Sequence, residues 1–395
     1  MPATLAAPPK RNKPGFDARL EPIIEKINSQ QRLTLDDGLL LYETPDIWTV
    51  CGLADSVRRR LHGDIAYYNI NRHLNYSNIC ALSCKFCSFY RKKKDESGAY
   101  EHSLEDIRAE AIRAAESGAT EIHIVGGLHP WLPFDYYTDM MRVIRDAAPQ
   151  LHIKAFTAVE IVHLARISKR GRDGYEGIKS VLRDLINAGL GSLPGGGAEV
   201  FDDRVHDEAY KGKIRAGTWL DVHKAAHELG LNSNATMLYG HIEQREDRIR
   251  HMITLREAQD VALKRSEGGF FQTIIPLPFF PDESELEHLP APTGLENLRT
   301  LAISRLMLDN FPHVKAFWIM QSLQMAQLML QSGADDIDGT VVWYDITKVG
   351  GSTTHQEVTV FDLQKAIREA GFTPIERDTL YRRVQRTGRE WSIVN

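Results

Sequence analysis

Three of the four cysteines in the chain lie within eight residues. Cys80, Cys84 and Cys87 follow one another at intervals of four and three residues. Thiolates bind soft metal ions strongly, and four cysteines are too few for a disulfide framework in a chain of this size, so the cluster indicates a metal site. The fourth, Cys51, lies in a stretch with helical periodicity, where we expect a buried thiol without a metal.

Two other interpretations of the cysteine cluster have to be weighed. The same spacing lines one face of a helix, but Asn75, Ser77 and Lys85 make the segment too polar for a buried helix. A structural zinc ion normally closes its tetrahedron with a fourth Cys or a His at short spacing, and no local pair of histidines follows Cys87. Three thiolates on a four-iron cluster would instead leave one iron open to a substrate or cofactor.

A basic run, Arg91–Lys94, comes directly after the cysteines. Such runs are usually solvated faces. A second interpretation is that this one attracts an acidic electron-donor protein.

Several further polar and glycine-rich segments follow short apolar runs. They are Gly126-Gly127-Leu128-His129, the segment from Pro194 to Glu199, and the segment from Tyr239 through Gly240 to Glu243. In isolation each predicts a turn, because glycine permits backbone conformations that other residues disfavour. Glu160 fits a carboxylate at the start of a helix, and Pro276 would stiffen a strand end.

The elements that position these residues alternate along the chain. Apolar, β-rich runs are separated by amphipathic stretches, which predicts parallel strands joined by helices. Eight such units predict an α/β fold of the (β/α)8 TIM-barrel type, in which active sites lie on the loops after the strands. The expected strands are residues 65–71, 121–125, 152–156, 191–193, 232–238, 270–275, 314–319 and 339–343.

Four regions are expected along the chain. Residues 1–15, with four prolines, predict a mobile arm, and residues 16–64 predict a helical lead-in. The barrel is expected at 65–349, and 350–395 as an extension packed on it.

Composition restricts the class of protein. The 395 residues are 43% hydrophobic and 26% charged, which excludes a disordered chain, a collagen and a coiled coil. A net charge of −5 gives no overall basic field, so we expect neither a nucleic-acid nor a membrane partner. No long apolar run and no secretory signal is evident, which predicts a cytoplasmic protein that acts on a small molecule.

The cysteine motif, with Phe86 before its last cysteine, resembles the signature of the radical S-adenosylmethionine enzymes. The resemblance implies a [4Fe-4S] cluster held by Cys80, Cys84 and Cys87, whose fourth iron is chelated by S-adenosylmethionine. It also implies a low-potential electron donor such as flavodoxin or ferredoxin, whose electron releases methionine and a 5′-deoxyadenosyl radical.

The same resemblance assigns cofactor contacts at successive strand ends. It implies that the backbone of Gly126 and Gly127 approaches the methionine amino group. It also implies that acidic residues contact the nucleoside or the amine of the cofactor. The implied cofactor-binding residues are Phe86, Gly126, Gly127, Glu160, Glu199, Tyr239, Gly240, Glu243 and Pro276.

From about residue 39 to 383 the chain is similar to the subgroup that contains the aminofutalosine synthases, the dehypoxanthine futalosine cyclases and the deazaflavin-precursor synthases. The segments Trp131–Tyr137 and Phe201–Asp207 most resemble the aminofutalosine synthases. That resemblance implies radical addition to 3-[(1-carboxyvinyl)oxy]benzoate, giving 6-amino-6-deoxyfutalosine, methionine and bicarbonate. S-adenosylmethionine would then be consumed as a co-substrate.

The side chains expected to act on this substrate are those that lie at or just after the ends of the predicted strands. His73, His129 and Tyr344 are candidate catalytic residues, and His129, Thr340 and Tyr344 are candidate substrate contacts. Two alternatives remain open: a hydrogen-abstracting enzyme of the same subgroup, such as a dehypoxanthine futalosine cyclase, and a non-catalytic protein that binds zinc or a structural Fe–S cluster.

Overall fold

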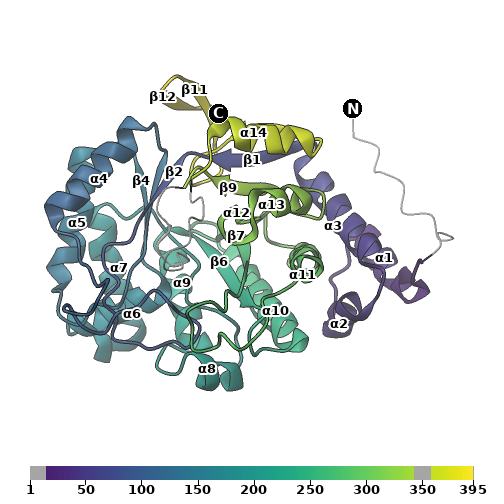
Figure 1. The fold of residues 1–395 in the computed structure, drawn as a ribbon, viewed down its shortest axis with the longest axis horizontal. Helices are drawn as coiled ribbons and strands as arrows, with labels where there is room; N and C mark the ends of the chain where they lie inside the picture. Colours follow the sequence, from purple (N-terminus) through teal and green to yellow (C-terminus); the bar gives the residue numbers. More distant parts are fainter. Residues whose placement is uncertain (1–14, 342–356, 395) are drawn as a thin grey trace.

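A curled sheet of seven parallel strands lies at the centre of the protein (Figure 1). The computed structural model describes residues 15–341 and 357–394. The strands follow one another around the sheet in chain order. They are β2 (Asn71–Leu74), β3 (Glu121–Ile124), β4 (His152–Ala155), β5 (Ser192–Leu193), β6 (Asn232–Tyr239), β7 (Phe271–Pro278) and β8 (His313–Val314).

A second sheet of three strands continues the curl. In it β1 (Ile65–Asn69) lies between β9 (Asp336–Gly339) and β10 (Thr373–Glu376), and both neighbours are parallel to it. Because β1 leads directly into β2, and a bridge between Lys315 and Asp336 joins the end of β8 to β9, the two sheets together complete the ring. The expected (β/α)8 barrel is confirmed.

Helices surround the ring. Side chains alternate across each strand, so that Ile122 and Ile124 face these helices while His123 faces the interior. The helices between the strands are α4 (Leu104–Glu116), α5 (Phe134–Ala147), α6 (Ala158–Ile167), α7 (Gly174–Ala188), α8 (Asp203–Ala209), α9 (Ala216–Glu228), α10 (Arg245–Leu263), α11 (Gly294–Met307), α12 (Trp318–Gln321) and α13 (Leu323–Leu330), with a short 3-10 turn η2 at Gly171–Asp173.

Helices α4 and α6 each begin with a reciprocal pair of capping hydrogen bonds. At α4 the Ser103 hydroxyl accepts the N–H of Asp106 while the Asp106 carboxylate accepts the N–H of Ser103. Thr157 and Glu160 make the same reciprocal pair at α6. Such capping boxes satisfy backbone donors that a helix start leaves without partners, so these residues fix where the helices begin.

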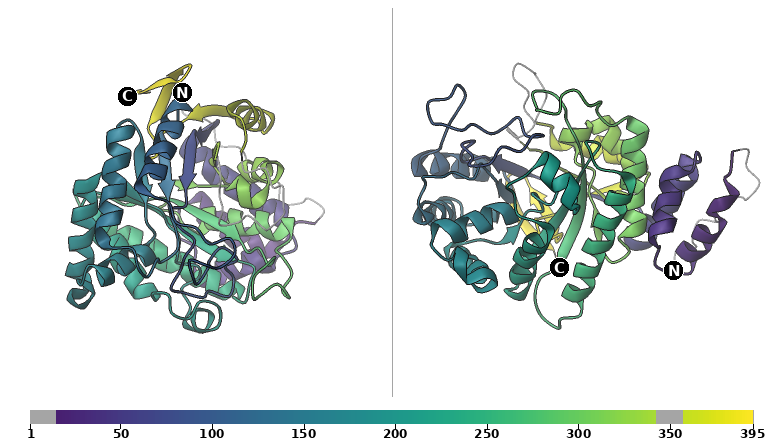
Figure 2. Two further views of the ribbon diagram at one scale, coloured as in Figure 1. Left: turned by 60° about the vertical axis from the view of Figure 1, so that its left-hand side comes forward. Right: turned by 90° about the horizontal axis from the view of Figure 1, so that it is seen from below.

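Helices also fill the region before the barrel. After the turn η1 (Ala18–Leu20) come α1 (Glu21–Asn28), α2 (Leu35–Glu43) and α3 (Ile47–His62). Figure 2 shows them as a lobe at the side of the barrel, where α2 packs on α10 and α3 packs on α11. Cys51 lies on α3 with 4% of its surface exposed.

The described part of the C-terminal region lies against the first strand. Helix α14 (Val360–Glu369) packs on α13, and β10 follows it beside β1. An antiparallel hairpin of β11 (Arg383–Thr387) and β12 (Glu390–Val394) ends the described chain.

Three expected strands differ from the structure. The strand expected at 339–343 begins three residues earlier, as β9, because Asp336 to Gly339 are the residues that pair with β1. Residues 342 and 343 of that run lie outside the described residues. The run at 65–71 forms two strands, because the chain changes partner sheet between Asn69 and Asn71. The run at 314–319 forms a regular strand only at His313–Val314, continues as a single bridge from Lys315 to Asp336, and turns into α12 at Trp318. The expected arm lies outside the described residues except for Gly15.

Candidate active site

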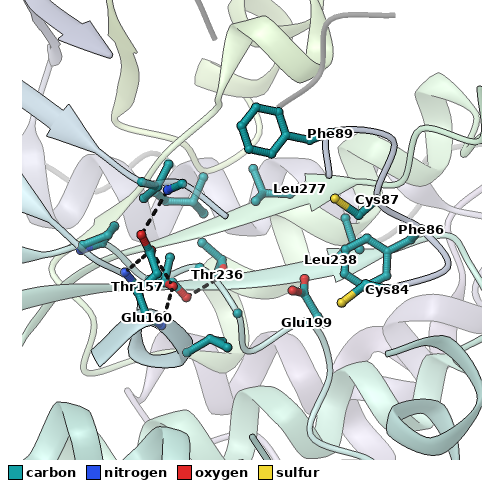
Figure 3. Close-up of a pocket in the computed structure, with 18 of the residues that line it drawn as sticks. Cys84, Phe86, Cys87, Phe89, Thr157, Glu160, Glu199, Thr236, Leu238 and Leu277 are labelled. Carbon is teal, nitrogen blue, oxygen red and sulfur yellow. Dashed lines mark hydrogen bonds between the residues drawn. The ribbon is translucent and has the colours of Figure 1, made fainter. Parts of the chain in front are cut away.

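A cavity opens where the strands of the main sheet end (Figure 3). Figure 3 shows Cys84, Cys87 and Phe86 on one side of it and Thr157 and Glu160 on the other. The sequence-predicted residues that line the cavity are Cys80, Cys84, Cys87, Phe86, Gly126, Gly127, Glu160 and Glu199. These residues follow β2, β3, β4 and β5, in the loops or, for Glu160, in the first turn of α6, so the fold gathers them from four segments.

The cysteine loop is held in place by backbone hydrogen bonds to neighbouring loops. The Cys80 N–H donates to the Arg91 carbonyl at 2.9 Å, and the Lys85 N–H donates to the Ala209 carbonyl at 2.8 Å. The Cys80 thiol also accepts the Leu128 N–H at 3.4 Å. The loop has no regular secondary structure, and these contacts direct its thiols to one cavity.

The spacing of the thiols distinguishes between metal sites. In the described part of the chain, only His62, His313 and Asp335 form a group of three whose ligand atoms all lie within 4.8 Å of one another. The three cysteine sulfurs form no such group, and three thiolates alone leave a tetrahedral zinc ion without a fourth protein ligand. A four-iron cluster gives each thiolate an iron of its own, so the donor set fits a cluster better than a single ion.

Burial keeps two of the thiols protonated in the absence of a metal. Desolvation raises the pKa of Cys84 to about 12, although the nearby Lys213 ammonium acts in the opposite direction. Desolvation also raises the pKa of Cys87. A metal must therefore displace a proton when it binds these sulfurs.

An ion pair lies next to the cysteines. The Lys213 ammonium donates to the Glu199 carboxylate, and both side chains are at least 86% buried. Lys213 also lies 4.9 Å from the centre of the Phe86 ring, within the range of a cation–π contact. The pair gives the apolar surroundings of Cys84 a fixed positive charge balanced by a carboxylate.

The two glycines after β3 fit closely beneath the cysteine loop. A Cβ added to Gly126 would lie 2.6 Å from the Tyr76 ring, and one added to Gly127 would lie 2.3 Å from the Ile79 carbonyl oxygen. The Gly127 N–H donates to the Ser77 carbonyl at 2.8 Å. Glycine is therefore required here by packing as well as by any ligand.

Glu160 connects this glycine segment to α6. Its Oε2 accepts from the backbone and hydroxyl of Thr157, both at 2.8 Å, and its Oε1 accepts the Gly126 N–H at 3.0 Å. Burial raises the pKa of Glu160 to about 7 against the effect of these donors. The carboxylate thus lines the cavity while serving as a helix cap.

Four expected cofactor contacts lie outside the cavity lining. The Glu243 carboxylate accepts from Gly240, His241 and Arg248, all within its own loop and the helix that follows. Tyr239 donates to Asn297 at 2.8 Å. Gly240 has φ +92°, and its added Cβ would meet Pro292. On β7 the neighbours Ile275 and Leu277 line the cavity in place of Pro276.

The expected substrate residues also lie elsewhere. His129 is fully buried: its Nδ1 accepts the N–H groups of Trp131 and Leu132, and its Nε2 lies 2.8 Å from Glu101. The hydroxyl of Thr340 ties the end of β9 to Asn71. His73 is buried beside His123, with ring centroids 4.4 Å apart. Tyr344 lies outside the described residues.

Sequence reasoning missed a group of polar residues inside the ring. His123, Lys154, Asn234, Lys315 and Asp338 line the inner part of the cavity. The two lysines each interrupt an apolar run, in Ile153-Lys154-Ala155 and Val314-Lys315-Ala316. A charged residue in the middle of an apolar run is the sequence signal that would have indicated them. Burying a charge costs free energy unless the charge has a partner, so such a residue marks a special site.

The two lysines of this group are ion-paired. Lys154 lies 2.5 Å from Glu121, and Lys315 lies 2.6 Å from Asp338. Burial favours the neutral forms of Glu121 and Asp338, yet the surrounding cations outweigh it and hold the pKa of both carboxyls below the usual range. Both carboxyls are therefore ionised.

Comparisons with known proteins agree with this geometry. Residues 74–255 match the family model "Radical SAM superfamily", and residues 267–389 match "CofH/MqnC C-terminal region". The aminodeoxyfutalosine synthase of Thermus thermophilus is 42% identical over 93% of this chain and 97% of its own length, and that of Streptomyces coelicolor is 44% identical over 93% and 94%. The crystal structure of methylornithine synthase shares the fold, with a TM-score of 0.70 at 14% identity over 89% of this chain and 97% of its own.

Among the described residues, no helix is both long and apolar enough to cross a bilayer.

Proposed function

Because the chain belongs to the radical S-adenosylmethionine superfamily and is an enzyme of that type, we propose that it is an aminodeoxyfutalosine synthase. The proposed substrates are 3-[(1-carboxyvinyl)oxy]benzoate and S-adenosylmethionine. The proposed products are 6-amino-6-deoxyfutalosine, methionine and bicarbonate, in the biosynthesis of menaquinone. The observation that carries the proposal is the 42–44% identity to two synthases of this name over nearly the full length of all three chains.

Membership of the radical S-adenosylmethionine superfamily implies a [4Fe-4S] cluster. We propose Cys80, Cys84 and Cys87 as its ligands. When bound, the cluster supplies the electron that cleaves S-adenosylmethionine and makes its adenosyl group reactive. Three thiols at one cavity support this assignment over a single zinc ion, which needs a fourth ligand. The Lys213–Glu199 pair then holds a cation close to the anionic cluster.

We propose that S-adenosylmethionine lies between the cysteine loop and the ends of β3, β4 and β5. The residues we assign to it there are Phe86, the backbone of Gly126 and Gly127, and the carboxylates of Glu160 and Glu199. All of them line the cavity, and they come from loops that the ring holds together. Leu238, Ile275 and Leu277 surround the site with apolar side chains, which keeps water from the reacting carbon.

The source of electrons and the compartment are also part of the proposal. The short basic segment around the cluster loop supports an acidic low-potential donor such as flavodoxin or ferredoxin. Of that segment, Lys92 donates to the Leu82 carbonyl and Lys94 pairs with Glu101. We place the reaction in the cytoplasm.

The test is an anaerobic assay of the iron-reconstituted, dithionite-reduced enzyme with both substrates, analysed by mass spectrometry. The expected result is an adduct that contains the adenosine and benzoate parts, with one methionine released for each adduct. Free 5′-deoxyadenosine without an adduct would exclude the synthase and favour a hydrogen-abstracting enzyme such as a dehypoxanthine futalosine cyclase. Intact S-adenosylmethionine on an enzyme with its full iron content would exclude both.

A further inference from the structure

Buried polar side chains line the inner end of the cavity. In the register of the sheet, His123 on β3 lies beside Lys154 on β4. Lys315 follows β8, and Asn234 lies on β6. Only 4% of Lys154 and 3% of Lys315 is exposed, and both line the cavity. We call Lys154, Lys315, His123 and Asn234 the polar floor.

The two ion pairs face the cavity differently: Lys154 faces it without its carboxylate partner, whereas both members of the Lys315–Asp338 pair line it. Glu121, the partner of Lys154, is fully buried and does not line the cavity, so it neutralises the ammonium from behind. Asp338, the partner of Lys315, does line the cavity, and it also lies 3.8 Å from the buried Arg377. An ammonium has three N–H groups, and one carboxylate oxygen occupies only one of them, so both lysines keep donors for a ligand.

A neutral donor or acceptor lies beside the lysines. The Nε2 atom of His123 is buried and has no hydrogen-bond partner among the described residues. Burial holds the pKa of His123 well below its usual range, and the neighbouring His73 and Lys154 act in the same direction. A buried polar atom without a partner costs free energy, and a ligand that bonded to it would recover that cost.

The walls above the floor are apolar and include an aromatic ring. Val125, Ile275, Leu277, Phe317 and Met320 line this part of the cavity. The cavity therefore leads from the thiols, past apolar walls, to two ammonium groups. This order matches a flat molecule with an anionic group at the end remote from the cluster.

We propose that the polar floor binds the ring carboxylate of an aromatic acid, with Lys154 and Lys315 as its two cationic donors. The inference rests on the proposed function for its choice of carboxylate. The vinyl methylene of 3-[(1-carboxyvinyl)oxy]benzoate has to face the adenosyl group, so the ring carboxylate is the group that reaches the floor. The lysines then act as specificity residues that orient the substrate.

The test measures binding to the cluster-loaded enzyme in the presence of S-adenosylmethionine, without reductant. The probes are 3-methoxybenzoate, which cannot react, and its methyl ester, which lacks the charge. The variant Lys154→Met with Glu121→Gln removes one ion pair without leaving a buried charge, and Lys315→Met with Asp338→Asn does the same for the other. Lys365→Met is the control, because Lys365 is exposed and pairs only within α14.

We expect each double variant to bind 3-methoxybenzoate about 10- to 100-fold more weakly, the range for a lost charged hydrogen bond. Binding of the ester should change less than threefold, and Lys365→Met should bind both as the unmodified enzyme does. The electron paramagnetic resonance signal of the reduced cluster with S-adenosylmethionine should be the same in all variants, which shows that the cofactor end is intact.

The outcomes separate this inference from the proposed function. If the unmodified enzyme does not bind 3-methoxybenzoate, or if both double variants bind it as tightly, the polar floor is not a carboxylate site. If binding depends on the lysines but 3-[(1-carboxyvinyl)oxy]benzoate gives no adduct, the floor stands and the proposed substrate is wrong. Equal weakening for acid and ester would assign the lysines a purely structural role and overturn the inference.

Discussion

Glu160 holds the backbone of Gly126 across two neighbouring strand ends, with 3.0 Å between its Oε1 and the Gly126 nitrogen. The same carboxylate caps α6 through Thr157. One side chain therefore fixes the start of a helix and the position of the glycine segment under the cysteine loop. Its ionisation has a predictable effect on stability.

The stability of the protein should depend on pH through Glu160. Burial raises its pKa from 4.5 to about 7, so the folded state binds this proton more tightly than the unfolded state does. The free energy of unfolding should then fall by up to about 3 kcal/mol as pH rises from about 4.5 through 7. Glu160→Gln lacks this dependence. Urea unfolding of both proteins between pH 5 and 8 measures the difference, and parallel curves would contradict the prediction.

Substitution of the three clustered cysteines should remove the cluster. Cys80→Ala, Cys84→Ala and Cys87→Ala are each expected to lower the iron content and to abolish cleavage of S-adenosylmethionine, because each removes one thiolate ligand. Cys51→Ala is the matched control: it also removes a thiol, but from α3. Iron and sulfide analysis after anaerobic reconstitution provides the measurement. A cysteine variant of the cluster that kept full iron and activity would not be a ligand.

Gly127→Ala should disturb the cysteine loop. The added methyl group would lie 2.3 Å from a backbone carbonyl oxygen, which cannot move away as a flexible side chain can. We expect a loss of about 1–3 kcal/mol in the free energy of unfolding, together with a lower iron content. Gly217→Ala is the control, since Gly217 lies in α9 with open space around it and alanine favours helices by up to about 1 kcal/mol. Equal behaviour of the two variants would show that the close packing has no effect.

Lys213→Met should lower the free energy of unfolding more than removal of both members of its ion pair does. It leaves the Glu199 carboxylate, of which 11% is exposed, without its cation, and such a change costs about 3–5 kcal/mol. The double variant Lys213→Met with Glu199→Gln is expected to recover most of this loss. Chemical unfolding of the unmodified protein, both single variants and the double variant completes the cycle. Additive losses would mean that the two residues do not stabilise each other.

Local features of the sequence predicted much of the fold and about half of the residues that were expected at the site. The expected strands at 121–125 and 152–156 agree with β3 and β4 to within one residue, because apolar, β-rich runs define them. The cysteines and the glycine pair line the cavity, because short motifs and their strand ends lie next to each other in the chain.

Residues whose role depends on distant partners could not be placed in the same way. The sequence gives His129 the correct strand end, but its ring turns to the N–H groups two and three residues later and to Glu101. Glu243 likewise binds its own loop and Arg248. In the polar floor, Lys154 meets Glu121 only because β3 and β4 pair in one register, which no local pattern specifies.

The pairing of β1 with β10 has a consequence for the order of events during synthesis. Ile65 on β1 lies beside Thr373 on β10, so the first strand receives this neighbour only after β2 to β9 have been synthesised. Contacts between residues so distant in the sequence form slowly, since a long loop must close before they stabilise anything. The three-stranded sheet that closes the ring is thus among the last parts of the barrel to form.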